Sequence, residues 1–217
     1  CKQSASVRGK HIALQVGVTG AGKSSLVHFW KGSRFVKGAN GGPVPDPDCH
    51  VARSLEHICV STKATSETST TAAVEVQLGD VDDPNEVLPC EGAVHIVDCP
   101  GLSDTRGFEF AVANEISIVL TAQQAESVII LFVHSHRNTG SKLAHVPFVI
   151  GEVSRLIPSL AENLGAVRWI WTGFQDKELQ SGGFLPSISS RDGSTGNVWK
   201  YFKDRGYFNQ LIYVSNV

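Results

Sequence analysis

The chain has 217 residues, 41% of them hydrophobic, which is enough to bury one sizeable core, so we expect a single α/β domain over residues 1–217. A formal net charge of -2 argues against nucleic acid as a partner, because such binding depends on clustered Lys and Arg that neutralise phosphates. The five cysteines are widely spaced without a C-x-x-C pair, which suggests neither a disulfide framework nor a zinc site and favours a reducing, cytoplasmic compartment.

The longest apolar run, residues 127–133, has the length of a buried strand. It falls far short of the roughly 20 residues that cross a bilayer, so the sequence does not indicate a membrane segment. A charged region followed by an apolar stretch, which would mark a signal peptide, is also missing. The chain has no methionine, even at its first position, and we expect it to be a fragment of a longer protein.

Short apolar runs alternate along the chain with longer stretches of helical period, the pattern of a mostly parallel sheet with helices on both faces. We therefore expect a three-layer, doubly wound α/β fold with a six-stranded sheet. Strands are expected at 11–18, 73–78, 92–97, 127–133, 167–171 and 210–214, the second and third as a hairpin, and helices at about 23–32, 108–125, 142–164 and 198–203. Runs of turn residues predict surface loops at 32–48 and 180–197.

Directly after the first expected strand, Gly17 to Ser24 carry the pattern G-x-x-x-x-G-K-[ST]. Such a loop wraps phosphates with its backbone N–H groups and the positive end of the following helix. We expect Lys23 to reach the β- and γ-phosphates, the Ser24 hydroxyl to bind Mg²⁺, and Ser25 to touch the α-phosphate. The other loop residues expected to contact the nucleotide are Thr19, Gly20, Ala21 and Gly22.

The third expected strand is followed by the turn Asp98-Cys99-Pro100-Gly101. A carboxylate at the carboxyl end of a strand beside the phosphate loop can hold Mg²⁺ through water, and the Gly101 N–H can sense the γ-phosphate. By itself D-x-P-G is a common turn sequence. With the phosphate loop upstream, it predicts a nucleotide-dependent switch.

The segments G-V-T-G-A-G-K-S-S-L and V-D-C-P-G-L-S-D-T-R-G resemble the translation-factor-related P-loop GTPases. Within that class they are similar to the septin, AIG1/Toc and dynamin-like branches, and to P-loop domains of large protist proteins. The resemblance covers roughly residues 11–176 and is strongest at the two phosphate motifs. It implies a Ras-like G domain that binds GTP or GDP with Mg²⁺, hydrolyses GTP, and acts as a switch or an assembly module.

The resemblance also implies a threonine in the first switch that coordinates Mg²⁺ and reads the γ-phosphate. The candidates are Ser69, Thr70 and Thr71, just before the strand expected near residue 73, and we favour Thr71, with Thr70 second. The run 61–71 is so rich in hydroxyl groups that a polar, solvated loop is an equal alternative for any one of them.

Guanine selectivity in the family depends on an [NT]-K-x-D motif after the fifth strand. Here Thr172 fits the motif, Gly173 replaces the lysine, and Asp176 comes one residue late. Two interpretations of Asp176 are open: it reaches the base through a bulged loop, or it caps a polar turn. The last strand ends near Ser215, where the family places a backbone contact to the base. An ATP-binding P-loop protein therefore remains an alternative.

Hydrolysis is expected to be slow, because Leu102 follows Gly101 where small GTPases carry a glutamine. The resemblance suggests that Arg106 stabilises charge across a homodimer, with a surface ion pair as the alternative. A catalytically inert pseudo-GTPase scaffold is a further alternative. Outside these motifs, residues 134–137, at the carboxyl end of the fourth strand, are expected in a polar loop, with metal binding by His134 and His136 as the alternative. Trp169 and Trp171 are expected in the core of the sheet.

Overall fold

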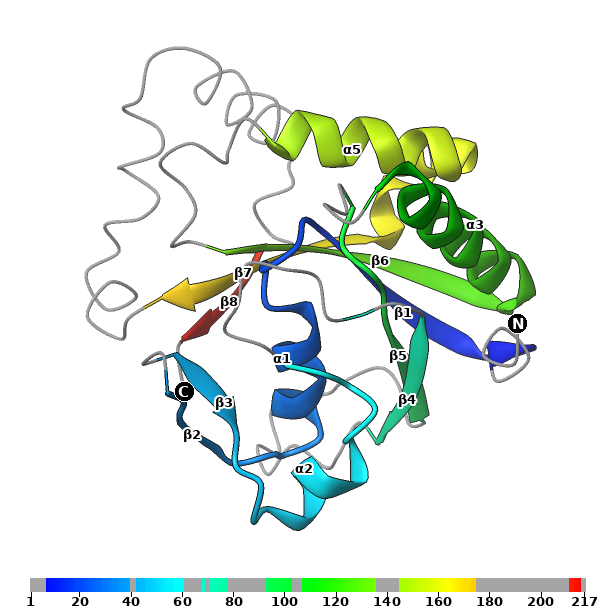
Figure 1. Ribbon diagram of the computed structural model, residues 1–217. Coiled ribbons are helices and arrows are strands. Elements are labelled where there is room, and N and C mark those ends of the chain that lie inside the picture. Colours follow the sequence, from blue (N-terminus) through cyan, green and yellow to red (C-terminus); the bar gives the residue numbers. More distant parts are fainter. Residues whose placement is uncertain are drawn as a thin grey trace.

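A computed structural model describes residues 7–39, 42–60, 68, 71–77, 93–102, 107–135, 145–174 and 211–215 of the chain (Figure 1). The loop predicted at 180–197, the helix predicted at 198–203, and the site residues Thr70, Arg106 and Asp176 lie outside these ranges. Within them, no helix has both the length and the apolar character needed to cross a bilayer.

A six-stranded sheet forms the centre of the molecule. In spatial order its strands are β4 (Ala72–Gln77), β5 (Ala93–Asp98), β1 (His11–Val16), β6 (Ser127–Ser135), β7 (Val167–Phe174) and β8 (Leu211–Ser215). Only β4 is antiparallel to its neighbour, and the other pairs are parallel. This arrangement confirms the predicted doubly wound sheet and the predicted hairpin of its second and third strands.

Helices cover both faces of the sheet, which confirms the three layers (Figure 1). The helices are α1 (Lys23–Trp30), α2 (His50–Ser54), α3 (Phe108–Gln124) and α5 (His145–Leu156). Leu26 and Val27 of α1 belong to one apolar core, with side chains from alternate positions of the strands. Ile118 of α3 and Val149 and Val153 of α5 belong to the other core, on the opposite face. Each central strand is therefore buried on both sides, as parallel sheets usually are.

The long helix expected at 142–164 is interrupted. Helix α5 ends at Leu156, and two 3₁₀ turns follow it, at Pro158–Glu162 and Leu164–Ala166. Proline has no N–H to continue the helical hydrogen bonds, and its ring clashes with the preceding turn. The break expected at Pro158 is confirmed.

The expectation that residues 32–48 have little regular structure is wrong. Strands β2 (Phe35–Lys37) and β3 (Pro43–Pro45) pair as an antiparallel ribbon. Proline is tolerated in such a short edge strand, where a missing N–H costs little. The Gly- and Pro-rich composition therefore marks a tight hairpin.

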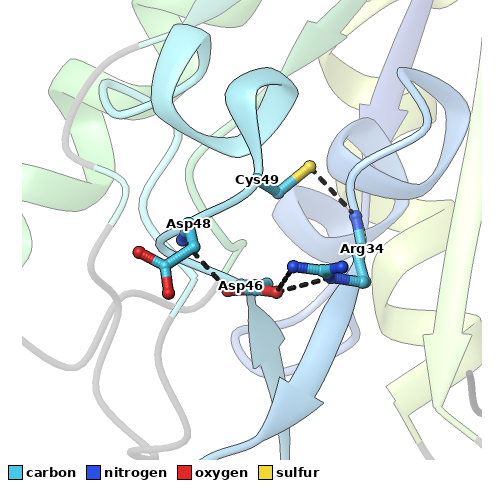
Figure 2. Close-up of polar contacts among 4 residues, drawn as sticks. All are labelled: Arg34, Asp46, Asp48 and Cys49. Carbon is cyan, nitrogen blue, oxygen red and sulfur yellow. Dashed lines mark hydrogen bonds and ion pairs between the residues drawn. The ribbon is translucent and has the colours of Figure 1, made fainter.

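Hydrogen bonds and an ion pair hold the open end of this hairpin together (Figure 2). The Arg34 guanidinium donates to the Asp46 carboxylate, with 2.5 Å between Nε and Oδ2. The other Asp46 oxygen accepts the Asp48 N–H at 3.0 Å, and the Arg34 N–H points at the Cys49 sulfur at 3.5 Å. The Asp48 N–H, followed by the Arg34 side chain, holds the pKa of Asp46 below its usual value. These contacts connect the hairpin to the start of α2.

The expectation of a polar loop at His134 is also wrong. Strand β6 continues to Ser135, and the His134 ring is buried against Trp169 and Trp171, with ring centres 5.4 and 5.3 Å away. Both tryptophans are buried in the sheet core, as predicted. Burial lowers the pKa of His134 to about 4. The imidazole is therefore neutral at physiological pH.

Candidate functional site

The glycine-rich loop joins β1 to α1 and is shaped by local backbone constraints. Gly22 caps the helix with a φ of 91°, a left-handed conformation that strains other residues. Gly20, at the exposed tip, also has a positive φ. The helix begins at Lys23 and places Ser24 and Ser25 in its first turn. The first helical N–H groups thus face the space that the loop encloses, as an anion-binding loop requires.

Lys23 folds back across this loop. Its ammonium donates to the carbonyl oxygens of Gly17 and Val18, each at 3.2 Å, and the side chain is buried. Burial lowers the pKa of Lys23, and the nearby Asp98 carboxylate opposes that shift. The ammonium is therefore positioned on the inner side of the loop, where phosphate oxygens can replace the two carbonyls as its acceptors.

The second motif lies directly against the first. The Leu102 N–H donates to the Gly17 carbonyl at 3.1 Å, and Val18 and Leu102 form a short parallel bridge. A Cβ atom at Gly101 would lie 2.4 Å from the Thr19 hydroxyl oxygen and 2.8 Å from its backbone nitrogen. Because any larger residue would push the two loops apart, glycine is required here.

Three oxygen-bearing side chains converge beside Lys23. The Ser24 hydroxyl donates to Asp98 Oδ2 at 2.7 Å, and the Thr68 hydroxyl lies 3.2 Å from Ser24 Oγ and 3.5 Å from Asp98 Oδ2. Asp98 is fully buried at the carboxyl end of β5. We call Ser24, Thr68 and Asp98 the oxygen cluster. It joins the start of α1, the chain before β4 and the end of β5.

The oxygen cluster has the chemistry of a Mg²⁺ site. Mg²⁺ prefers oxygen ligands and is usually bound by one or two carboxylates together with substrate phosphates and waters. Because the Ser24 hydroxyl gives its hydrogen to Asp98, its lone pairs point away from the carboxylate and can face a cation. The second Asp98 oxygen, Oδ1, is buried without a hydrogen-bond partner among the described residues. Those residues contain no group of three His, Cys, Asp or Glu that could hold a metal in another way.

Burial also sets the charge state around Asp98. It raises the pKa of the Asp98 carboxyl, while the Ser24 hydrogen bond and the Lys23 charge act in the opposite direction. It also raises the pKa of the neighbouring Cys99 thiol, which therefore stays neutral. A cation bound at the cluster would favour the ionised carboxylate.

Thr71, the favoured switch threonine, is not at this site. Its hydroxyl lies 3.0 Å from Ser117 Oγ and 3.4 Å from Thr121 Oγ1, both on α3, and the residue is buried. Strand β4 begins at the next residue, so Thr71 packs at the end of the sheet against a helix. Thr68, three residues earlier, is the hydroxyl that reaches the oxygen cluster. Sequence alone missed it, because the run 61–71 offers many equivalent hydroxyls.

The end of β7 is connected to the phosphate loop. The Thr172 hydroxyl donates to the Ala21 carbonyl at 2.8 Å and lies 3.3 Å from the His134 carbonyl. Thr172 therefore ties the sheet to the loop, and its predicted contact with the base stays a prediction. Just beyond it, Gly173 has a φ of 83°, and the pairing of β7 with β8 shifts register between Trp171 and Phe174.

Strand β8 ends at Ser215, whose backbone lies level with Phe174 of β7. The predicted base contact at Ser215 is thus at the same edge of the sheet as Thr172 and the phosphate loop. Predicted contacts of Thr19, Gly20, Ala21 and Ser25 with phosphate also stay predictions, although all four lie in or directly after the loop.

Comparison with known proteins identifies the fold. The sequence matches no protein-family model and no curated protein. An arginine-to-alanine variant of Toc33 from Arabidopsis thaliana, described as dimerization deficient, superposes with a TM-score of 0.52 at 14% identity, over 100% of this chain and 75% of that one. Toc33 from the same plant in complex with GDP and Mg²⁺ gives a TM-score of 0.51 at 16% identity, over 98% and 73%. The predicted α/β fold of a P-loop GTPase domain is confirmed, and this chain shares it with Toc33.

Proposed function

We propose that this chain is a guanine-nucleotide-binding domain that hydrolyses GTP slowly with the help of Mg²⁺. The observation that carries the proposal is the junction of the phosphate loop with the oxygen cluster. Lys23, which can bind phosphate, and Ser24, which can bind a cation, are adjacent in α1, and the latter already bonds to Asp98. A triphosphate with its cation needs both groups at one place.

In this proposal the chain's residues divide the work of binding. The loop N–H groups and Lys23 would hold the β- and γ-phosphates, and Ser24 and Asp98 would hold Mg²⁺. Thr68 is the first-switch threonine, and Gly101 lies against Thr19 of the phosphate loop. When bound, Mg²⁺ neutralises phosphate charge that develops during hydrolysis.

Guanine rather than adenine is supported by the irregular end of β7. The family motif needs an aspartate three residues after the threonine, whereas Asp176 comes four residues after Thr172. The register shift at Gly173 is where a strand absorbs one additional residue. We propose that this bulge corrects the spacing and brings Asp176 to the base. The missing lysine is the feature that favours ATP, and it makes ATP the second candidate.

Hydrolysis in this proposal depends on a second copy of the chain. Leu102 is buried against the phosphate loop and has no group to orient water. We propose that Arg106 of a second copy supplies charge at the nucleotide. An arginine replacement in the fold neighbour Toc33 is described as dimerization deficient, which supports testing an arginine near the switch.

Nucleotide titration is the test of the proposal. Fluorescent mant-GDP and mant-ADP would be titrated into the 217-residue chain with Mg²⁺, and we expect tight binding of mant-GDP only. Lys23→Ala is the matched control, because it removes the phosphate-binding ammonium, and it should weaken binding by at least about 100-fold. Tight mant-ADP binding without mant-GDP binding would overturn the guanine assignment, and equal affinity of Lys23→Ala would overturn the site.

A further inference from the structure

A polar side chain not accounted for by the proposed site lies under the phosphate loop. Gln15, in β1, is completely buried. Neither its amide nitrogen nor its amide oxygen has a hydrogen-bond partner among the described residues. Buried amides are nearly always paired, because leaving one unpaired costs free energy that an apolar residue would not. This position in a central strand would otherwise suit an apolar residue.

Gln15 lies beside Asp98 in the adjacent strand. Leu14 is paired in register with Val97, so the next residues along the two parallel strands, Gln15 and Asp98, are level with each other. Leu14 and Val97 both belong to the core under α3 and α5. Since side chains alternate along a strand, those of Gln15 and Asp98 both point to the opposite face, which α1 covers.

Gln15 can donate the hydrogen bond that Asp98 can accept. Asp98 uses Oδ2 to accept the Ser24 and Thr68 hydroxyls, while its Oδ1 is buried and unpartnered within the described part of the chain. The Gln15 amide has two hydrogens to donate and no net charge. A lysine at this place would compete with the cation for the carboxylate, whereas an amide only orients it.

We propose that Gln15 is a positioning residue for Asp98. Its amide N–H group, directly or through one bound water, donates to Asp98 Oδ1 and fixes the carboxylate plane so that Oδ2 faces Ser24 and Mg²⁺. Hydrogen bonds of this kind, to a group that holds a metal, typically change metal affinity by about 10- to 100-fold. The inference rests on the proposed function, because it assigns Gln15 to the same cation site.

The test is the Mg²⁺ dependence of nucleotide release from the 217-residue chain. Mant-GDP dissociation would be followed at increasing Mg²⁺ concentrations, and mant-GDP affinity would be measured separately in EDTA. Gln15→Met replaces the amide with an apolar group of similar volume. We expect this variant to need a roughly 10-fold higher Mg²⁺ concentration for half-maximal retention of mant-GDP. Affinity in EDTA should stay within about twofold of the wild-type value, because no phosphate contact has been removed.

Leu14→Met is the matched control, since it changes the neighbouring residue of the same strand on the opposite face at similar volume. It should leave both measurements unchanged. If Gln15→Met does not fold, Gln15→Asn retains an amide with a shorter reach and is expected to raise the Mg²⁺ requirement in the same direction.

The outcomes distinguish the inference from the function on which it rests. A wild-type chain that fails to retain mant-GDP in a Mg²⁺-dependent manner would overturn the proposed function. If the wild type shows that dependence and Gln15→Met or Gln15→Asn has the same Mg²⁺ requirement, only the proposed role of Gln15 would be overturned. A variant that is merely more stable, with an unchanged Mg²⁺ requirement, would show that the amide is an unpaired core residue.

Discussion

Lys23 and Asp98 are two oppositely charged groups that the fold removes from water at the centre of the site. Burial of each disfavours its charged form, and their mutual attraction opposes that effect. The charged forms of such buried groups are stabilised most by a ligand that brings the opposite charge. In the proposed function a magnesium–nucleotide complex would do so for both, with phosphate opposite the ammonium and the cation opposite the carboxylate.

Two threonines three residues apart should behave differently when altered. We expect Thr68→Ala to raise the Mg²⁺ requirement for GTP binding by roughly 10-fold, because it removes a hydroxyl from the oxygen cluster. Thr71→Val should leave that requirement unchanged and lower the free energy of unfolding by about 1 kcal/mol, because the Ser117 hydroxyl loses its neighbour. Mg²⁺-dependent binding of a GTP analogue, together with urea unfolding, would check both. The reverse pattern would restore Thr71 as the switch threonine.

His134 should make stability depend on pH. Its pKa is about 4 in the folded protein and 6.5 in the unfolded chain, so only the unfolded chain takes up a proton between these values. Stability is therefore complete above pH 6.5 and falls as pH decreases towards 4, by about 3 kcal/mol from this residue. Urea unfolding of the wild type and of His134→Phe from pH 7 to 4 measures the difference. Identical pH slopes for the two proteins would contradict it.

At the scale of elements, the phosphate loop is held from two sides. The turn after β5 contacts it through Leu102 and Gly101, and the end of β7 contacts it through Thr172. Both contacts are made at the carboxyl edge of the sheet, where ligands bind in doubly wound folds. The loop conformation thus depends on two segments distant in sequence as well as on its own glycines.

Removing the β7 contact should loosen the loop. Thr172→Val keeps the shape of the side chain but removes the hydroxyl that donates to Ala21. Losing one such hydrogen bond, worth about 1 kcal/mol, should accelerate mant-GDP dissociation by roughly fivefold. Thr121→Val is the control, because its buried hydroxyl donates within α3 to Ser117. Stopped-flow measurement of mant-GDP release from both variants would test this prediction. Equal acceleration in both would point to a general loss of stability.

At the scale of the whole molecule, the sheet brings Lys23 and the oxygen cluster to one edge. In the proposed function, the group that orients the attacking water comes from outside the chain. The residue after Gly101 is the buried Leu102, which cannot act on water. In the proposed function, the chain binds nucleotide by itself and needs a further group to reach a higher rate of hydrolysis. A second copy of the chain is the proposed source.

Phosphate release per molecule should therefore increase with protein concentration. We expect Arg106→Ala to abolish that increase, because the arginine would stabilise charge at the partner's nucleotide. Arg155→Ala is the control, since Arg155 lies on α5 in ion pairs with Glu115 and Glu152. Single-turnover phosphate release over a range of concentrations would measure the effect. A rate that stays flat in the wild type would contradict assistance by a second copy.

The sequence by itself determined the features whose physics is local. The phosphate loop, the D-x-P-G turn and the break at Pro158 each depend on a few neighbouring residues whose backbone limits are known. The six strands of the main sheet and the helices α1, α3 and α5 followed from hydrophobic period, because each of these elements must bury one face.

Only the tertiary structure decided which distant residues meet. Thr68 rather than Thr71 reaches Ser24, because β4 begins at Ala72 and turns the preceding hydroxyl towards α3. His134 is buried because β6 extends to Ser135 and the His134 ring packs against Trp169 and Trp171 of the neighbouring strand β7. Gln15 is level with Asp98 because of strand register. None of these pairings has a local signal, since contact energy between segments selects among side chains that are equivalent in sequence.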